Sequence, residues 1–439
     1  MSENVLNEDN SSVYKDNALS EAVLSLSTDD VCEALAAGGD PNHTILGKYR
    51  GTRTLLHAVC KGYEPGGYDV RAFIVERLLE AGAKPNTLDS EGEVPLHVAL
   101  HYVADPTIRA LVKHGADLHS KQQGLWAYPV LTVAAQGGLD WLVAQCLTAG
   151  ADVQHLDGGG GSPLHGAYYQ IPVIGGRFNL SVAKRLIEAG ADVNAVNREE
   201  AAPIHLAARW VDSVPGLALL LESGADITLA DKKGNRPIHL AAEFSSEGKL
   251  ALLLKHGADL DVQNRKGFTP LLHQIAENGF SEQTARLIAL GADVKAVGKK
   301  GETVFSLWIS KNNRFKELEY IERTVLADLL KRGAPAAPMN SSLTGLLHRL
   351  AKGEHDDLIP AAVSAGASLS TTAKDGWTPL HNAAVHCDSD TVAALLAAGA
   401  DASVVSSKVR KIKGKAFAMG CTAKDVAEML GNTKTAALL

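Results

Sequence analysis

The sequence has few aromatic residues, few cysteines and no long apolar run. Only 5% of its 439 residues are Phe, Trp or Tyr, although 46% are hydrophobic. The five cysteines are scattered without a CxxC pair or a metal-binding spacing, so we expect free thiols in a reducing compartment and no metal site. No apolar run reaches the roughly 18 residues of a membrane span, and the polar start does not resemble a signal peptide. These absences predict a protein that does not contact a membrane and is either cytoplasmic or exported by a route that the sequence does not show.

Charge and local motifs exclude further classes of protein. The formal net charge of -7 argues against a general polyanion binder, although it leaves local basic patches open. The glycine run at 157–165, "DGGGGSPLH", lacks the GK[ST] ending of a phosphate loop, so we interpret it as a turn. The neighbours His386 and Cys387 have no third partner that would make a catalytic set. We therefore expect no cofactor and no enzyme activity.

Two short phrases recur along the chain. The first is "PIHLAA" at 203–208 and again at 237–242, with looser copies at 94–100, 162–168 and 378–384. The second is Gly-Ala-Asp or a near variant, which begins at Gly82, Gly115, Gly150, Gly190, Gly224, Gly257, Gly291, Gly333, Gly366 and Gly399. A period of about 33 residues over most of a long chain predicts a solenoid of repeats in place of separate globular domains.

Each repeat is predicted to form two helices. Proline suits the first position of the first helix, where its missing N–H costs nothing. A hydroxyl at Ser162, Thr269 or Thr378 can cap that helix. The glycine of Gly-Ala-Asp is expected to end the second helix in the left-handed conformation, and a polar segment then turns the chain back.

These phrases, "PLHxAA", "LLxxGAD" and "DxxGxTPLH", resemble the ankyrin repeat over roughly residues 20–439. The resemblance implies an all-α fold with short β-hairpin fingers, arranged as a curved stack of helix-turn-helix units. It also implies that the first helices and the fingers line a concave face. In such proteins the His of the phrase ties neighbouring repeats together, so we expect a structural role for His57, His97, His165, His205, His239 and His381.

The repeats set the predicted domain organisation. Residues 1–17 are expected to be flexible, and 18–49 to form an N-terminal capping repeat. Ankyrin repeats fill 50–334, and further repeats fill 335–403 after a candidate seam. A C-terminal capping repeat with a long basic finger completes the chain at 404–439, because a solenoid needs polar caps.

Residues that vary between repeats are the candidates for binding a partner. The resemblance places the residues after the Ala pair, and those beside the turn glycine of each finger, on the concave side. Aromatic and arginine side chains are enriched at binding hot spots. The predicted partner-binding residues are Tyr102, Trp126, Tyr128, Tyr169, Arg209, Trp210, Phe244, Lys232, Lys233, Arg236, Arg265, Lys266, Phe268, Lys299, Lys300 and Trp377.

The leading hypothesis is a non-catalytic scaffold that captures another protein. Basic residues on three consecutive fingers favour a partner with an acidic surface. The scaffold is interpreted either as an adaptor or as an inhibitor or immunity-type protein that covers an enzyme or toxin. The alternative is nucleic-acid or other polyanion binding through the basic fingers, against which the net charge counts.

Overall fold

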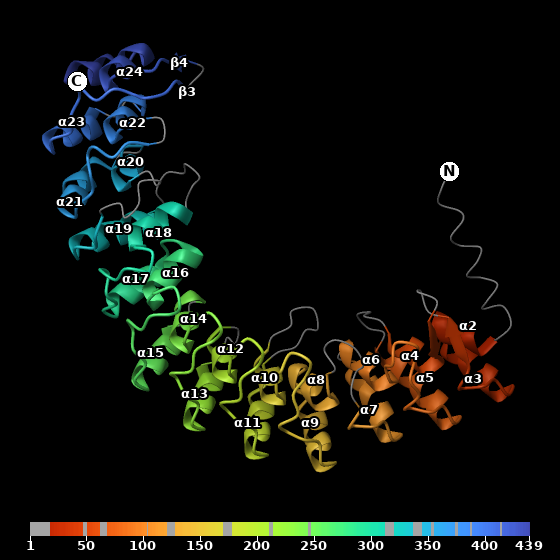
Figure 1. Ribbon diagram of the computed structural model, residues 1–439. Coiled ribbons are helices and arrows are strands. Elements are labelled where there is room, and N and C mark those ends of the chain that lie inside the picture. Colours follow the sequence, from red (N-terminus) through yellow and green to blue (C-terminus); the bar gives the residue numbers. More distant parts are fainter. Residues whose placement is uncertain are drawn as a thin grey trace, which may run out of the picture. The chain divides into compact units, whose positions relative to one another are not determined.

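The computed structural model describes residues 18–46, 51–61, 68–102, 104–120, 128–169, 178–209, 214–244, 247–311, 320–336, 345–352, 355–373, 376–386, 389–412 and 415–439. Throughout these residues the chain runs as successive pairs of short helices (Figure 1). The chain divides into two compact units, Met1–Asp226 and Ile227–Leu439. Below, the two helices of a pair are called the first and the second helix, and the segment that joins one pair to the next is called a finger.

In the first unit, the first helices of the described pairs are α2 (Ala18–Ser25), α4 (Leu55–Cys60), α6 (Pro95–His101), α8 (Val130–Gln136), α10 (Pro163–Tyr168) and α12 (Pro203–Arg209). Their second helices are α3 (Thr28–Ala36), α5 (Tyr68–Glu80), α7 (Asp105–Lys113), α9 (Asp140–Thr148), α11 (Leu180–Glu188) and α13 (Val214–Glu222). Consecutive first helices contact one another from α2 to α12 and make one row. One finger includes the antiparallel strands β1 (Thr44–Leu46) and β2 (Thr52–Thr54), with Ile45 opposite Arg53.

In the second unit, the first helices of the described pairs are α14 (Pro237–Glu243), α16 (Pro270–Asn278), α18 (Val304–Lys311), α20 (Leu346–Leu350), α22 (Pro379–His386) and α24 (Ala423–Leu430). Their second helices are α15 (Glu247–Lys255), α17 (Glu282–Ala289), α19 (Tyr320–Lys331), α21 (Ile359–Ser364, preceded by the 3-10 turn η2, Asp356–Leu358), α23 (Ser389–Ala397) and α25 (Thr433–Leu438). A finger with strands β3 (Arg410–Ile412) and β4 (Lys415–Phe417) precedes the last pair, with Lys411 opposite Ala416. Consecutive first helices again contact one another, from α14 to α24, and the candidate seam after Ala334 lies inside this unit, where α18 contacts α20 and α19 contacts α21.

Local chemistry explains the ends of the helices. Proline begins α6, α10, α14 and α16, as predicted, and the hydroxyl of Thr269 accepts a hydrogen bond from the backbone N–H of Leu272. The glycine after each second helix has a positive φ, between +75° and +96° at the ten predicted positions. No other residue type adopts this conformation at so little cost, so the glycine fixes where the second helix ends.

After the end of several second helices, a side-chain amide makes two hydrogen bonds to the backbone of the next repeat. We call this pair of bonds a bracket. The Asn86 side chain donates a hydrogen bond to the carbonyl of Gly115 and accepts one from the backbone N–H of Asp117. Asn194 repeats the arrangement with Gly224 and Asp226. Each bracket therefore joins one repeat only to the next.

Packed apolar side chains fill the space between the rows of helices. The largest fully buried side chains include Trp308, Trp377 and Tyr168. The rings of Phe280 and Trp308 are stacked, with centroids 4.8 Å apart, and join α18 to the segment before α17. Such rings contribute the largest apolar areas in a chain that is otherwise rich in small Ala and Leu side chains. In the part of the chain that the structure describes, no helix has both the length and the apolar character needed to span a bilayer.

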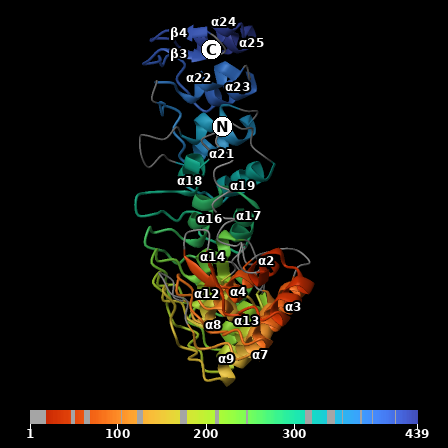
Figure 2. The ribbon, with the colours of Figure 1, turned by 90° about the vertical axis from the view of Figure 1, so that its right-hand side faces the viewer.

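The fingers of each unit project to one side of that unit's helices (Figure 2). An aspartate or asparagine at the base of several turns accepts two backbone N–H groups: Asp231 accepts from Lys233 and Asn235, and Asn264 from Lys266 and Phe268. These bonds close the turn locally, which is the reason why the phrase before each proline is rich in Asp and Asn.

Candidate partner-binding surface

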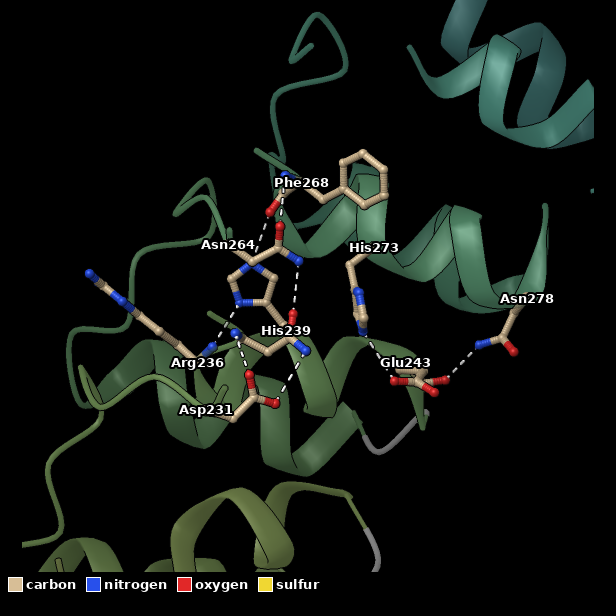
Figure 3. Close-up of polar contacts among 9 residues, drawn as sticks. Asp231, Arg236, His239, Glu243, Asn264, Phe268, His273 and Asn278 are labelled. Atoms are coloured by element: carbon tan, nitrogen blue, oxygen red, sulfur yellow. Dashed lines mark hydrogen bonds and ion pairs between the residues drawn. The ribbon is translucent and has the colours of Figure 1, made fainter. Parts of the chain in front are cut away.

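A histidine at the third position of several first helices ties its repeat to the following one. In α14, the His239 Nδ1 accepts a hydrogen bond from the backbone N–H of Arg236, and Nε2 lies 3.0 Å from the carbonyl oxygen of Phe268 on the next finger (Figure 3). Because Nδ1 accepts, the ring is the neutral tautomer whose Nε2–H donates to the carbonyl. Burial lowers the pKa of His239 to about 4, which keeps the ring neutral at pH 7.

The same bridge recurs along the described chain. The ring Nε2 reaches the carbonyl of Glu93 from His57, of Ala201 from His165 and of Cys421 from His381. His97 and His205 occupy the equivalent position and are 1% exposed. Burial lowers the pKa of His57 and His165, and lowers that of His97 to about 4. The geometry supports the structural role expected for His57, His165, His239 and His381, and burial is consistent with the same role for His97 and His205.

Aromatic side chains lie at the ends of several first helices, at the sixth or the seventh residue after the helix's proline, and these two positions together are called here the first-helix end. Tyr102 follows α6 and is half-buried, Tyr169 follows α10 and is 47% exposed, and Phe244 follows α14 and is 38% exposed. Arg209, the last residue of α12, is half-buried. In each of these helices the residues from the proline to the fifth residue after it are buried, so the first-helix end is where the helix presents side chains to solvent.

The first-helix end of α14 is held by polar contacts. The Nε2 of His273 lies 3.1 Å from a carboxylate oxygen of Glu243, and both side chains are nearly buried. The Asn278 side chain donates a hydrogen bond to the backbone carbonyl of Glu243 (Figure 3). These contacts join the ends of α14 and α16, next to Phe244.

Six cationic side chains are exposed on three consecutive fingers of the second unit. They form two rows at equivalent positions before each turn glycine, namely Lys232, Arg265 and Lys299 in one row and Lys233, Lys266 and Lys300 in the other. The backbone N–H of Arg265 donates to the carbonyl of Lys233 over 3.1 Å, and that of Lys299 to the carbonyl of Lys266 over 2.9 Å. Arg236, at the base of the first of these fingers, is half-buried. We call the six exposed cations the basic ridge.

Comparison with known families agrees with this geometry. Residues 217–298 match a family model described as ankyrin repeats in three copies, and residues 375–407 match the single ankyrin repeat. The chain is an ankyrin-repeat protein. The fold predicted from the sequence, an all-α ankyrin solenoid with short fingers, is confirmed.

Relatives with known names share only part of their length with this ankyrin-repeat chain. It is 32% identical to transient receptor potential cation channel subfamily A member 1 of Drosophila melanogaster over 131 residues, 27% of this chain and 10% of that protein. It is 33% identical to human ankyrin repeat and SOCS box protein 16 over 158 residues, 36% of this chain and 33% of that protein. It is 32% identical to the Schizosaccharomyces pombe glycerophosphocholine phosphodiesterase gde1 over 102 residues, 23% of this chain and 9% of that protein. The chain thus spans a third or less of these relatives, and the shared ankyrin repeats indicate a protein-protein interaction scaffold.

Two residues predicted to bind a partner are instead part of the core of this ankyrin-repeat stack. Phe268 is 5% exposed and Trp377 is fully buried. The Trp377 ring packs edge-on against Phe417, with centroids 6.0 Å apart, and lies 5.5 Å from the ring of His381. A ring in this position fills the space beneath the next first helix, so neither side chain reaches a partner. The prediction for these two residues was wrong.

Three further residues were predicted to bind a partner, namely Tyr128, Trp126 and Trp210. Tyr128 is half-buried, and burial together with Asp157 and Tyr169 raises its pKa. Trp126 and Trp210 lie outside the described residues, so their role stays a prediction.

Sequence reasoning missed two features of this region. His348 is a further bridging histidine, with Nε2 2.8 Å from the carbonyl of Trp377, and the signal was the phrase "LLH" at 346–348, which lacks the usual proline. His273 contacts Glu243 because the phrase "TPLLHQ" has an extra leucine, which moves the histidine by one residue along α16. A shift of one residue turns a side chain by about 100° around the helix, toward the first-helix end.

The cysteines of the described residues carry free thiols. Cys60 and Cys146 are buried, and burial raises the pKa of both to about 12, whereas Cys32 is exposed and Cys421 is partly exposed. Cys387 lies outside the described residues. Among the described residues no cluster of three or more His, Cys, Asp or Glu side chains could hold a metal ion.

Proposed function

We propose that this chain captures a partner protein on its first-helix ends and basic fingers. The observation that carries the proposal is that Tyr102, Tyr169 and Phe244 all lie at a first-helix end, next to the buried part of a first helix. A solenoid uses its repeated residues for stacking, so a side chain that varies at a fixed position is available for recognition. Aromatic rings bury a large area with few rotatable bonds, which suits them to that use.

The surface is proposed to be rigid before the partner arrives. In α14 the helix runs from Arg236 at the finger to Phe244 at the first-helix end, a rise of about 12 Å at 1.5 Å per residue. His239 fixes the finger end and the Glu243–His273 pair fixes the other end (Figure 3). A surface fixed at both ends loses little conformational entropy on binding, which favours affinity.

The proposal also covers the compartment in which the chain acts, the surface charge of its partner and the effect of binding on that partner. We propose a non-catalytic chain that acts in a reducing compartment such as the cytoplasm, where its free thiols persist. Its partner is proposed to present an acidic surface to the basic ridge. An inhibitor or immunity-type protein would cover the active site of its partner, so a loss of the captured enzyme's activity on binding would separate inhibition from simple recruitment.

Removing the exposed rings is expected to weaken capture without unfolding the chain. Each of Tyr169→Ala and Phe244→Ala should weaken binding about tenfold, because one hot-spot ring contributes on the order of 1–2 kcal/mol. Both side chains are well exposed, so stability should change by less than about 1 kcal/mol. The measurement is affinity purification from cells of the source organism with mass spectrometry, followed by titration of the recovered partner against each variant.

The matched control is Phe73→Ala. Phe73 lies on the second helix α5 and is 39% exposed, against 38% for Phe244, so the two substitutions remove the same ring from similar solvent exposure. We expect Phe73→Ala to leave the affinity for the partner unchanged. Equal affinities of the wild type and the Phe244 and Tyr169 variants would show that the partner binds elsewhere.

A further inference from the structure

The basic ridge has a regular spacing that restricts what it can bind. Each of its three fingers contributes two adjacent cations, and equivalent cations recur once per repeat. Neighbouring first helices in contact are separated by roughly 8–10 Å, so each row presents a positive charge about every 10 Å. The rows extend over three repeats, a length of about 20 Å between their outer cations.

The finger backbones hold this spacing. Besides the bonds from Arg265 to Lys233 and from Lys299 to Lys266, the Arg265 guanidinium donates to the carbonyl of Lys232 over 2.6 Å. The turn glycines make this approach feasible, because a Cβ on Gly234 would lie 2.5 Å from the backbone nitrogen of Arg265. The fingers therefore form a connected backbone ladder in which the rows of cations are pre-aligned.

The carboxylates nearest the tips are turned toward their own fingers. Asp231 accepts the backbone N–H groups of Lys233 and Asn235, and its other oxygen accepts from the Asn235 side chain. Glu302 accepts the backbone N–H of Lys300. These acidic groups are used to close the turns, so the outer surface of the fingers is dominated by positive charge.

We propose that the basic ridge binds an acidic segment in an extended, polyproline-II-like conformation, with carboxylates at every third residue. This conformation has three residues per turn and a rise of 3.1 Å per residue, so residues i, i+3 and i+6 share a face at intervals of about 9 Å. That interval matches the spacing of the cation rows. The segment also has a narrow cross-section, unlike an α-helix of about 10 Å diameter, and suits tips that are only two residues wide. The inference rests on the proposed function and specifies the part of the partner that this ridge contacts.

The test uses the full chain and fluorescent peptides measured by anisotropy. One peptide repeats Asp-Pro-Ser three times, and a second has the same composition with its three aspartates adjacent. We expect the spaced peptide to bind about fivefold more tightly at low salt and to weaken as salt approaches about 0.15 M, since exposed ion pairs are screened. The Lys266→Glu/Lys299→Glu variant should bind it at least about tenfold more weakly.

The matched control is the Lys255→Glu/Lys331→Glu variant. It makes the same change in net charge at exposed residues of the second helices α15 and α19, and should bind the spaced peptide like the wild type. Circular dichroism of both variants would show that the fold is retained.

Four results would overturn the inference. Equal binding of the two peptides would refute the spacing, and tighter binding of a helix-stabilised peptide with aspartates at i, i+7 and i+14 would refute the extended conformation. Tighter binding of a single-stranded oligonucleotide at about 0.15 M salt would identify the ridge as a nucleic-acid surface. If no peptide binds while Phe244→Ala still weakens capture of the native partner, the ridge inference fails and the proposed function stands.

Discussion

Acidification from about pH 7 to about pH 4.5 is expected to destabilise the repeats strongly, before most carboxylates are protonated. The cause is the buried histidine that recurs in several of the first helices. In His239 the Nδ1 accepts the backbone N–H of Arg236, so a proton on Nδ1 would place two donors against each other. The folded chain therefore disfavours the charged ring.

The direction of the pH effect follows from the two pKa values of each histidine. Burial lowers the pKa of His239 and of His97 from 6.5 to about 4 in the folded chain. Between these values the unfolded chain binds protons that the folded chain does not, so stability is complete above about pH 6.5 and falls as the pH approaches 4. Each such ring contributes up to about 3 kcal/mol to this loss, at about 1.4 kcal/mol per pKa unit. Urea unfolding followed by circular dichroism over this pH range measures the loss.

A variant isolates the contribution of one ring. In His239→Gln the amide can accept from Arg236 and donate to Phe268, but it does not titrate. We expect it to be less stable than the wild type at pH 7 and to lose less stability between pH 6.5 and 4.5. His256→Gln, at an exposed residue after α15, is the control and should keep the wild-type pH dependence. A His239→Gln chain with an unchanged pH dependence would refute the histidine mechanism.

Trp377→Ala is expected to destabilise the second unit by about 3–5 kcal/mol, the usual cost of removing a large buried ring. The Trp377 ring is fully buried between Phe417 and His381, and its carbonyl accepts the bond from His348. Truncation leaves a cavity at a joint between three successive repeats. The loss would be measured as a lower midpoint of thermal or urea unfolding.

Trp377→Phe serves as the matched variant, because it keeps an aromatic ring against Phe417 and should lose less stability than Trp377→Ala. If the Trp377→Ala chain has wild-type stability but binds the partner more weakly, Trp377 contacts the partner, as the sequence predicts.

The helix ends were predictable because each depends on one local interaction. Proline at the start of a first helix and glycine at the end of a second helix act through their own backbone, so no distant residue can change the outcome. The recurring phrase therefore determined the repeat, its two helices and the role of its histidine.

The orientation of the finger side chains was less predictable. Phe268 and Trp377 follow a turn glycine in "RKGFTP" and "KDGWTP", and the sequence shows that they belong to fingers without showing which way they point. Neighbouring repeats decide this, because a histidine of the preceding repeat binds the carbonyl of each residue, and the ring of Trp377 packs against His381 and Phe417. The side chains of the six cations one and two residues before the glycines are exposed.

The brackets made by Asn86 and Asn194 have a mechanical consequence. Each amide spans only the gap to the following repeat, so within a unit an applied pulling force is resisted by one set of local bonds at a time. Stretching the first unit from its ends should therefore peel off helix pairs in sequence and give a sawtooth of similar small steps in a force-extension trace.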